Sequence, residues 1–164
     1  MFRNERSPDH RLDRLTAFTM REIVVIGGED YVLEQRAALV DAVAEMMVAL
    51  DLACEIKTAD DPFFSNDALF KKVLQKQARL KYEVEVPLFG GRMTAVASIN
   101  LHRDFFSRNY DYRDHRGVHP FSACVGFGHE RLAYALFCRH GTELGQWPRA
   151  VLEYLGVAQP SPLM

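Results

Sequence analysis

The feature that most constrains the fold is a glycine turn between an apolar run and an amphipathic stretch, at residues 122–140. The apolar run ends at Gly126 and Gly128, and Arg131 follows three residues later. This order predicts a strand that enters a helix directly, with Arg131 in the first turn. Such a junction presents backbone N–H groups and the positive end of a helix dipole, and an arginine adds a planar set of donors suited to phosphate. A plain turn beside a solvated arginine explains the spacing equally well, because a lone Gly-x-Gly is weak evidence.

Hydrophobic periodicity predicts the other elements. The β-branched run 23–26, which stops at two glycines, indicates a buried strand within residues 15–27. Acidic residues then open a stretch with apolar side chains near the helical period, which predicts a helix over 29–52 with its methionines in the core. Alternation and turn residues predict strands at 53–59, 80–88 and 93–100, a hairpin turn at 89–92, and helices at 66–79 and 148–155.

The resulting fold class is α+β, with an antiparallel sheet of about six strands flanked by two or three helices. A short strand at 2–5 would pair with 15–27 as an antiparallel hairpin. The polar and aromatic stretch 102–120 is expected to be a long loop, and a loop of this length inside a compact domain is often functional. We expect one domain over 1–157 and a frayed tail over 158–164.

Composition excludes several function classes. The net charge of −2 gives no electrostatic footprint for bulk nucleic-acid binding. No apolar run approaches the roughly 18 residues needed to cross a membrane. Three widely spaced cysteines argue against a disulfide framework and for a reducing compartment, so we expect a cytoplasmic protein. The six histidines show no convincing ligand spacing, which favours scattered surface histidines over a metal cluster.

Two motifs and their order carry a family resemblance. FRNE at 2–5 resembles motif 2 of the class II aminoacyl-tRNA synthetases, F-R-x-E, and GFGHER at 126–131 resembles their motif 3, G-x-G-x-x-R. More narrowly, the chain resembles the amino acid:carrier protein ligases, which are homologues of the atypical, zinc-containing seryl-tRNA synthetases. The segments that carry this narrower match are MRE at 20–22, DDPFF at 60–64, ASINLH at 97–102 and SACVGFG at 122–128.

The resemblance implies an ATP site. Arg3 would hold the α-phosphate, where charge builds as the amino-acid carboxylate attacks, and Arg131 would hold the γ-phosphate of a bent ATP. Both tasks favour a fixed, always-charged guanidinium over a lysine. Glu5 would contact the adenine amino group. Mg²⁺ would bridge the phosphates, and the sequence does not identify its carboxylate ligand.

The resemblance also implies a zinc site for the substrate. Glu22 and Cys124 match two of the three protein ligands of this family, whose zinc binds the α-amino group of a small amino acid. Arg21 would lie beside the site, and Asn100 would line the pocket near the substrate or the ribose. From the residues alone, the position of Cys124 in an apolar strand favours a buried small hydrophobe, and Glu22 is equally well a plain ion-pair partner.

The resemblance implies a function, and it also implies that two parts of the family's catalytic domain lie outside this chain. We expect ATP-dependent activation of glycine or alanine as an aminoacyl-adenylate, followed by transfer to the phosphopantetheine thiol of a carrier protein. No transfer RNA is expected as partner, and the full-length family would form a homodimer. The chain would begin inside motif 2, without motif 1 and without the upstream zinc cysteine. The alternative is therefore a truncated, catalytically silent remnant that acts, if at all, as a partner-binding module.

Overall fold

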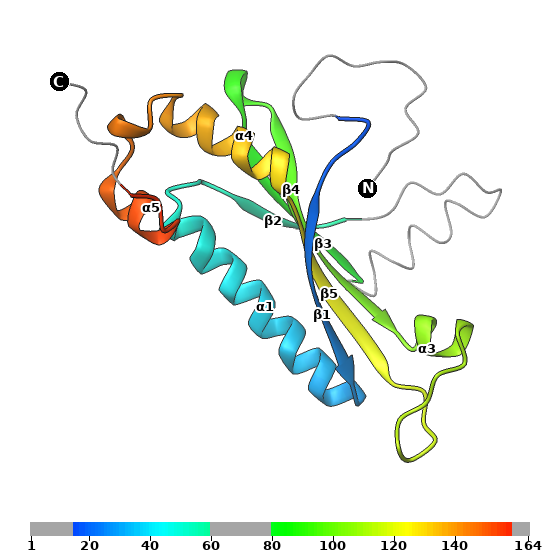
Figure 1. Ribbon diagram of the computed structural model, residues 1–164. Helices are drawn as coiled ribbons and strands as arrows, with labels where there is room; N and C mark the ends of the chain where they lie inside the picture. The colour runs from blue at the N-terminus through cyan, green and yellow to red at the C-terminus, as the bar shows by residue number, and fades with distance from the viewer. Residues whose placement is uncertain (1–14, 60–79, 159–164) are drawn as a thin grey trace.

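The computed structural model describes residues 15–59 and 80–158. Within these residues one five-stranded antiparallel sheet has the strand order β1-β5-β4-β3-β2 (Figure 1). The predicted α+β class and the antiparallel sheet are confirmed. The strand expected at 2–5 and the helix expected at 66–79 lie outside the described residues. The strands are β1 (Met20–Gly27), β2 (Glu55–Thr58), β3 (Lys81–Pro87), β4 (Met93–Arg103) and β5 (Phe121–Gly128).

The helices occur close to where periodicity predicts them. Helix α1 (Glu29–Ala49) ends three residues before the predicted bound, because Leu50 caps it and Asp51 takes a left-handed φ of 53°. The hairpin turn between β3 and β4 is confirmed as a short 3₁₀ turn, η1 (Phe89–Gly91), that needs glycine at Gly90, where φ is 79°. The remaining helices are α3 (Phe105–Asn109), α4 (His129–His140), η2 (Leu144–Gln146) and α5 (Arg149–Tyr154).

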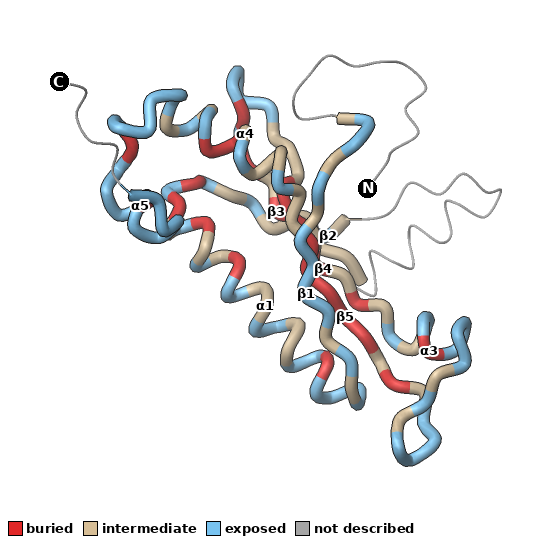
Figure 2. The backbone as a smooth tube through the Cα atoms, in the orientation of Figure 1, coloured by how far each residue is buried: buried red, intermediate tan, exposed pale blue. Residues whose placement is uncertain are grey.

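The helices α1, α4 and α5 cover one face of the sheet. Alternate residues of the strands point to this face, so Val84, Val86, Ile99 and Val125 are fully or almost fully buried. Met47 of α1 is also completely buried among them, as the methionine prediction requires. Strand β5, which lies between β1 and β4, is buried at every residue from Ser122 to Gly126, and Figure 2 shows it as a continuous buried stripe. The other half of the strand residues point to the opposite face.

The prediction of a buried strand at 23–26 is wrong. Ile23, Val24 and Ile26 are 50%, 55% and 53% exposed. The reason is topological, because β1 is the outermost strand of the described sheet and pairs there with β5 alone. A β-branched run predicts that a strand forms, but it does not predict how many neighbours cover that strand.

The expectation of a long loop over 102–120 is also partly wrong. Strand β4 continues to Arg103, and α3 follows at once, so regular structure occupies the first part of the stretch. Figure 1 places α3 and the turn after it at the end of the sheet opposite α4. Within the described residues, no helix is both long enough and apolar enough to cross a membrane.

Candidate functional site

The face of the sheet away from the helices carries a cluster of polar side chains, which we call the polar face. Cross-strand pairing places Glu22 and Ser98 on either side of Gly126, and Asn100 beside Cys124. All of these positions share one face, because side chains alternate along each strand and the pairs lie directly opposite one another. The polar face consists of Glu22 on β1, Ser98, Asn100 and His102 on β4, and Ser122, Cys124 and Gly126 on β5.

Cys124 lies at the centre of this face. Asn100 donates its amide Nδ2–H to the Cys124 Sγ at 3.6 Å, and the His102 Nε2 lies 3.6 Å from the same sulfur. Burial raises the pKa of the Cys124 thiol, and the charge of Glu22 raises it further, while the hydrogen bond from Asn100 opposes both effects. The thiol therefore stays protonated at neutral pH unless a cation compensates for the buried charge.

His102 is the neighbour that sequence reasoning did not identify as a site residue. Its Nδ1 lies 3.2 Å from the Oγ of Ser122, a residue that is 2% exposed. Burial lowers the pKa of His102, although the charge of Glu22 opposes this, so the ring is neutral at neutral pH. The signal was available, because His102 follows Asn100 at the two-residue spacing that keeps side chains on one face of a strand.

The prediction of surface histidines is therefore wrong for three of the five described histidines, which are half-buried. The ring of His119 faces the carbonyl oxygens of Ser107 and Tyr112 from its Nδ1, at 3.0 and 3.2 Å. The ring of His140 lies 3.0 Å from the Leu50 carbonyl. His119 and His140 hold loops and helix ends together, whereas His102 faces a thiol.

Gly126 leaves space on the polar face that side chains of β1 occupy. A Cβ at this position would lie 2.9 Å from the Met20 Cε and 3.3 Å from the Glu22 Oε1. The side chains of β1 therefore lean over the place where any other residue would project. Because Gly126 has no side chain, the Glu22 carboxylate lies over β5 at Gly126, two residues along the strand from Cys124.

The polar face contains the chemical groups that zinc prefers as ligands. A thiolate, an imidazole and a carboxylate are all zinc ligands. Their present placement is incomplete, since no group of three or more His, Cys, Asp and Glu side chains in residues 15–59 and 80–158 is positioned to hold a metal ion. Glu22 and Cys124 share the face, as the predicted ligand roles require, but those roles remain predictions.

The junction between β5 and α4 has the predicted form. Strand β5 ends at Gly128, α4 begins at the next residue, and no side chain from the described part of the chain caps this N-terminus. Arg131 lies in the first turn and is half-buried, and its Nη1 donates to the Ala95 carbonyl at 2.9 Å. The guanidinium is therefore directed toward β4 and held there. An arginine fixed beside a helix N-terminus adds charged donors to a site that already favours anions.

The start of β1 is tied to the same junction. The Glu130 carboxylate accepts the Thr19 backbone N–H, with both of its oxygens at 2.9 Å, and the His129 N–H donates to the Thr19 carbonyl at 3.0 Å. The hydrogen bond from the Thr19 N–H holds the pKa of Glu130 below its usual value. These hydrogen bonds fix the first turn of α4, and with it Arg131, relative to the strand that carries Glu22.

Of the other predicted site residues, one lies on the polar face, one does not, and two fall outside the described residues. Asn100 lies on the polar face beside Cys124. Arg21 does not, because it pairs with Phe127 and alternation directs it to the helix-covered face, opposite Glu22. Arg3 and Glu5, the predicted contacts of the ATP α-phosphate and of adenine, lie outside the described residues.

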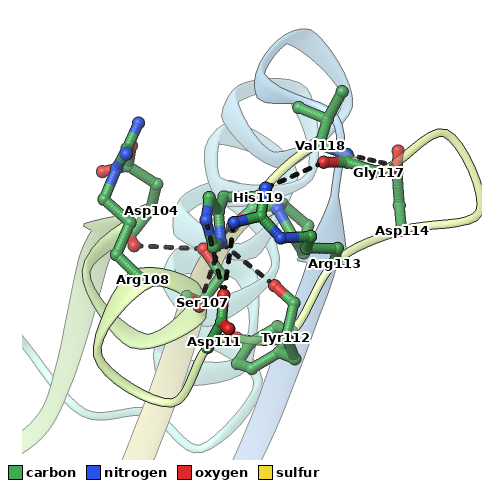
Figure 3. Close-up of polar contacts among 11 residues, drawn as sticks. Asp104, Ser107, Arg108, Asp111, Tyr112, Arg113, Asp114, Gly117, Val118 and His119 are labelled. Atoms are coloured by element: carbon green, nitrogen blue, oxygen red, sulfur yellow. Dashed lines mark hydrogen bonds and ion pairs between the residues drawn. The ribbon is translucent and has the colours of Figure 1, made fainter.

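The stretch after β4 forms a self-contained polar cluster rather than an open charged loop (Figure 3). Ser107 is fully buried and donates to the Pro120 carbonyl at 2.7 Å. The Asp114 carboxylate accepts the backbone N–H groups of Arg116 and Val118 at 2.9 and 3.0 Å. These hydrogen bonds, with the Arg116 side chain, hold the pKa of Asp114 below its usual value.

The arginines of this cluster are partly neutralised by aspartates. Ion pairs join Arg108 to Asp104, Arg113 to Asp111 and Arg116 to Asp114, as drawn in Figure 3 for the labelled residues. Each of these three arginines is therefore partly compensated by a neighbouring aspartate within the same stretch.

Comparisons with known proteins extend this description. No protein-family model matches the chain. Two ligases of Bradyrhizobium diazoefficiens, amino acid–acyl-carrier-protein ligases 2 and 1, are 42% and 39% identical to it over 155 and 153 residues. The matches cover 94% and 93% of this chain but 46% and 47% of the two ligases, so the chain spans about half the length of these curated relatives.

A solved structure of the seryl-tRNA synthetase of Methanopyrus kandleri, in complex with a transfer RNA of Aquifex aeolicus, has the same fold. It superposes with a TM-score of 0.73 at 26% identity, over 94% of this chain and 32% of the synthetase. The antiparallel sheet and its flanking helices are therefore those of a class II aminoacyl-tRNA synthetase catalytic domain.

Proposed function

We propose that this chain, a homologue of the amino acid–acyl-carrier-protein ligases with a class II synthetase catalytic fold, supports ATP-dependent activation of a small amino acid and its transfer to a carrier protein. The amino-acid carboxylate would attack the α-phosphorus of ATP, which forms an aminoacyl-adenylate and releases pyrophosphate. The phosphopantetheine thiol would then attack the carbonyl carbon, which forms a thioester and releases AMP. The identity of about 40% over nearly the whole chain is the observation that carries this proposal.

The phosphates would be held at the junction of β5 and α4. Arg131 would bind the γ-phosphate, exchanging or sharing its hydrogen bond to the Ala95 carbonyl. The N-terminus of α4, whose His129 N–H is bonded to the Thr19 carbonyl, would add its following backbone N–H donors and a favourable dipole. Arg3 would bind the α-phosphate, Glu5 the adenine amino group, and Mg²⁺ would bridge the phosphate oxygens.

The amino acid would lie on the polar face. Ser98 is a small neighbour there, which favours a short substrate side chain such as that of glycine or alanine. Asn100 would orient the substrate from β4. Glu22 and Cys124 would hold zinc, which, when bound, supplies a Lewis acid for the α-amino group. Arg21, on the opposite face, would support β1 rather than touch the substrate.

Amino-acid-dependent exchange of pyrophosphate into ATP tests the proposal, with glycine and alanine as substrates and zinc and Mg²⁺ present. We expect Arg131→Ala to reduce exchange about 100-fold or more, because it removes a charged donor to a group that carries transition-state charge. Arg139→Ala is the matched control on the same helix, where the guanidinium pairs with the exposed Asp51, and it should retain exchange. Exchange by the Arg131→Ala variant at the wild-type rate would contradict the proposed role.

A second candidate function is a binding module without catalysis. The exposed apolar side chains of β1, the outermost strand in the described part of the sheet, favour it, because such surfaces are common at protein interfaces. The same assay separates the two candidates. A folded protein with no exchange for any small amino acid would favour the binding module.

A further inference from the structure

We propose that a hollow beside the β3–β4 hairpin is a symmetric docking surface for a second copy of this chain. The hollow has a volume of about 590 Å³ and lies between the C-terminal ends of α1 and α4 and the turn η1. Its residues on α4, Cys138 and Arg139, are at the end of that helix opposite the junction with β5. The surface is therefore separate from the polar face, and association of two chains is measured without any ligase assay.

The walls of the hollow are mainly apolar, and Val48, Leu52, Pro87 and Leu88 contribute to them. Leu52 and Leu88 are buried members of the main core, so these walls are continuous with the core and keep their shape. Val48 is 80% exposed and lies at the rim. An apolar side chain that enters such a hollow leaves water and gains free energy in proportion to the area it buries.

A protruding aromatic ring lies at the rim of the same hollow. Phe89, in the turn η1, is 87% exposed. Hydrogen bonds fix the turn beneath it, since the Leu88 N–H donates to the Arg92 carbonyl at 2.8 Å and the Gly91 N–H to the Leu88 carbonyl at 2.9 Å. Figure 1 shows this turn projecting at the top of the view, beside α4. A ring on a fixed turn loses little conformational freedom when it binds, so its burial is effective.

The ring and the hollow occur on one patch, which is what a two-fold interface requires. In such an interface the same patch serves both subunits, so each residue contacts its counterpart's neighbour in both directions. Phe89 of each copy would enter the hollow of the other copy. This self-complementarity is the observation that favours a second copy over an unrelated partner.

The charges at the rim agree with a second copy as well. Asp51 and Arg139 are the charged residues among the described side chains that line the hollow. The Arg139 Nη2 donates to the Asp51 carboxylate at 2.8 Å, and both side chains are about half exposed. Because one acid balances one base, the rim attracts neither an acidic nor a basic partner. A two-fold axis would place Asp51 of one copy near Arg139 of the other, as a ring of four alternating charges.

The size of the patch implies weak association. A phenylalanine buries about 150–250 Å², so the two rings contribute roughly 300–500 Å². Stable interfaces bury about 1,200–2,000 Å² in total, and smaller ones belong to transient complexes. We therefore expect a reversible dimer whose population rises with protein concentration.

Sedimentation velocity of the purified full chain over a wide range of concentration tests the inference. The average mass should rise from that of a monomer toward that of a dimer. We expect Phe89→Ser to weaken association about tenfold or more, because a buried aromatic ring dominates a small interface. Phe105→Ser is the matched control, since this ring is 61% exposed on α3 at the opposite end of the sheet, and it should associate as wild type does.

Charge reversal gives a second test, which a failure to fold cannot imitate. Asp51→Arg alone and Arg139→Asp alone should each associate more weakly than wild type, because like charges then face one another across the axis. An equimolar mixture of these two variants should recover association, since each pair across the interface is again of opposite sign. The wild-type pair is exposed, so its loss costs little stability, and circular dichroism checks the fold of each variant.

Three outcomes would overturn the inference. One is a wild-type chain that stays monomeric at every concentration, and another is a dimer that Phe89→Ser leaves unchanged. The third is a pair of charge variants whose mixture associates no better than either alone. Val24→Ser identifies the rival surface on β1, because a dimer lost in this variant and kept in Phe89→Ser is formed there instead.

Discussion

At the scale of single residues, the glycine turn contains two glycines with different tasks. Gly126 leaves space that the Met20 and Glu22 side chains of β1 fill, whereas a Cβ at Gly128 would have its nearest contacts at 3.9 Å. A Gly-x-Gly spacing in the sequence cannot separate these cases, because the difference comes from side chains of a strand about one hundred residues away in the chain.

The pair of glycines gives a direct comparison. We expect Gly126→Ala to fold, because the Met20 Cε at 2.9 Å is the mobile end of a flexible side chain, but to push the Glu22 carboxylate away from the polar face. Zinc affinity should fall about tenfold or more, with a change of only a few degrees in Tm. Gly128→Ala is the control. Equal metal affinity in the two variants would show that the space at Gly126 does not position Glu22.

At the scale of elements, the sequence predicts helices and strands correctly where hydrophobic periodicity is strong. It does not predict how far a strand is buried, because burial depends on how many strands and helices pack against it. Helix α1, the alternation of β3 and the turn at Gly90 follow from local patterns that the tertiary structure agrees with. The exposure of β1 does not follow from a local pattern, because burial of a strand depends on which strands lie beside it. The regular structure after β4 was missed as well. Polar side chains suggest a solvated loop, but here they bond to the backbone of the same stretch.

The attachment of α1 to the sheet is testable at two adjacent positions. Met47 is completely buried in the core, whereas Val48 is 80% exposed. We expect Met47→Ala to lower the free energy of unfolding by about 2–5 kcal/mol, from lost transfer energy and a residual cavity. Val48→Ala should stay within about 0.5 kcal/mol of wild type. Urea denaturation curves measure both, and equal costs would contradict this assignment of the core face.

The turn after α3 gives a pH-dependent prediction. Asp114 has its folded pKa held below the ordinary value of 3.8 by the N–H groups of Val118 and Arg116. The unfolded chain therefore binds the proton more readily, so this carboxylate stabilises the fold above its ordinary pKa and the contribution is lost as pH falls through the folded value. We expect Asp114→Asn to melt below wild type near neutral pH. The gap in Tm should close at lower pH, and a gap that is constant with pH would contradict the account.

At the scale of the whole molecule, the sheet separates two tasks. One face is covered by helices and supplies the apolar core, and the other carries Glu22, Asn100, His102 and Cys124 from three neighbouring strands. The sequence predicted the fold class and three of these four residues through motif resemblance. The two-residue spacing from Asn100 places His102 on the same strand face, but its approach to Cys124 depends on the register at the end of β4, which the sequence does not show.

In the proposed reaction, this fold activates an amino acid and passes it to a carrier thiol. The most direct measurement is the intact mass of an acyl carrier protein bearing phosphopantetheine, after incubation with the chain, ATP, Mg²⁺, zinc and glycine or alanine. The account predicts a mass increase equal to one aminoacyl group, which requires ATP and is removed by hydroxylamine, as expected for a thioester. An unmodified carrier protein with both amino acids, in the presence of folded, zinc-loaded chain, would contradict it.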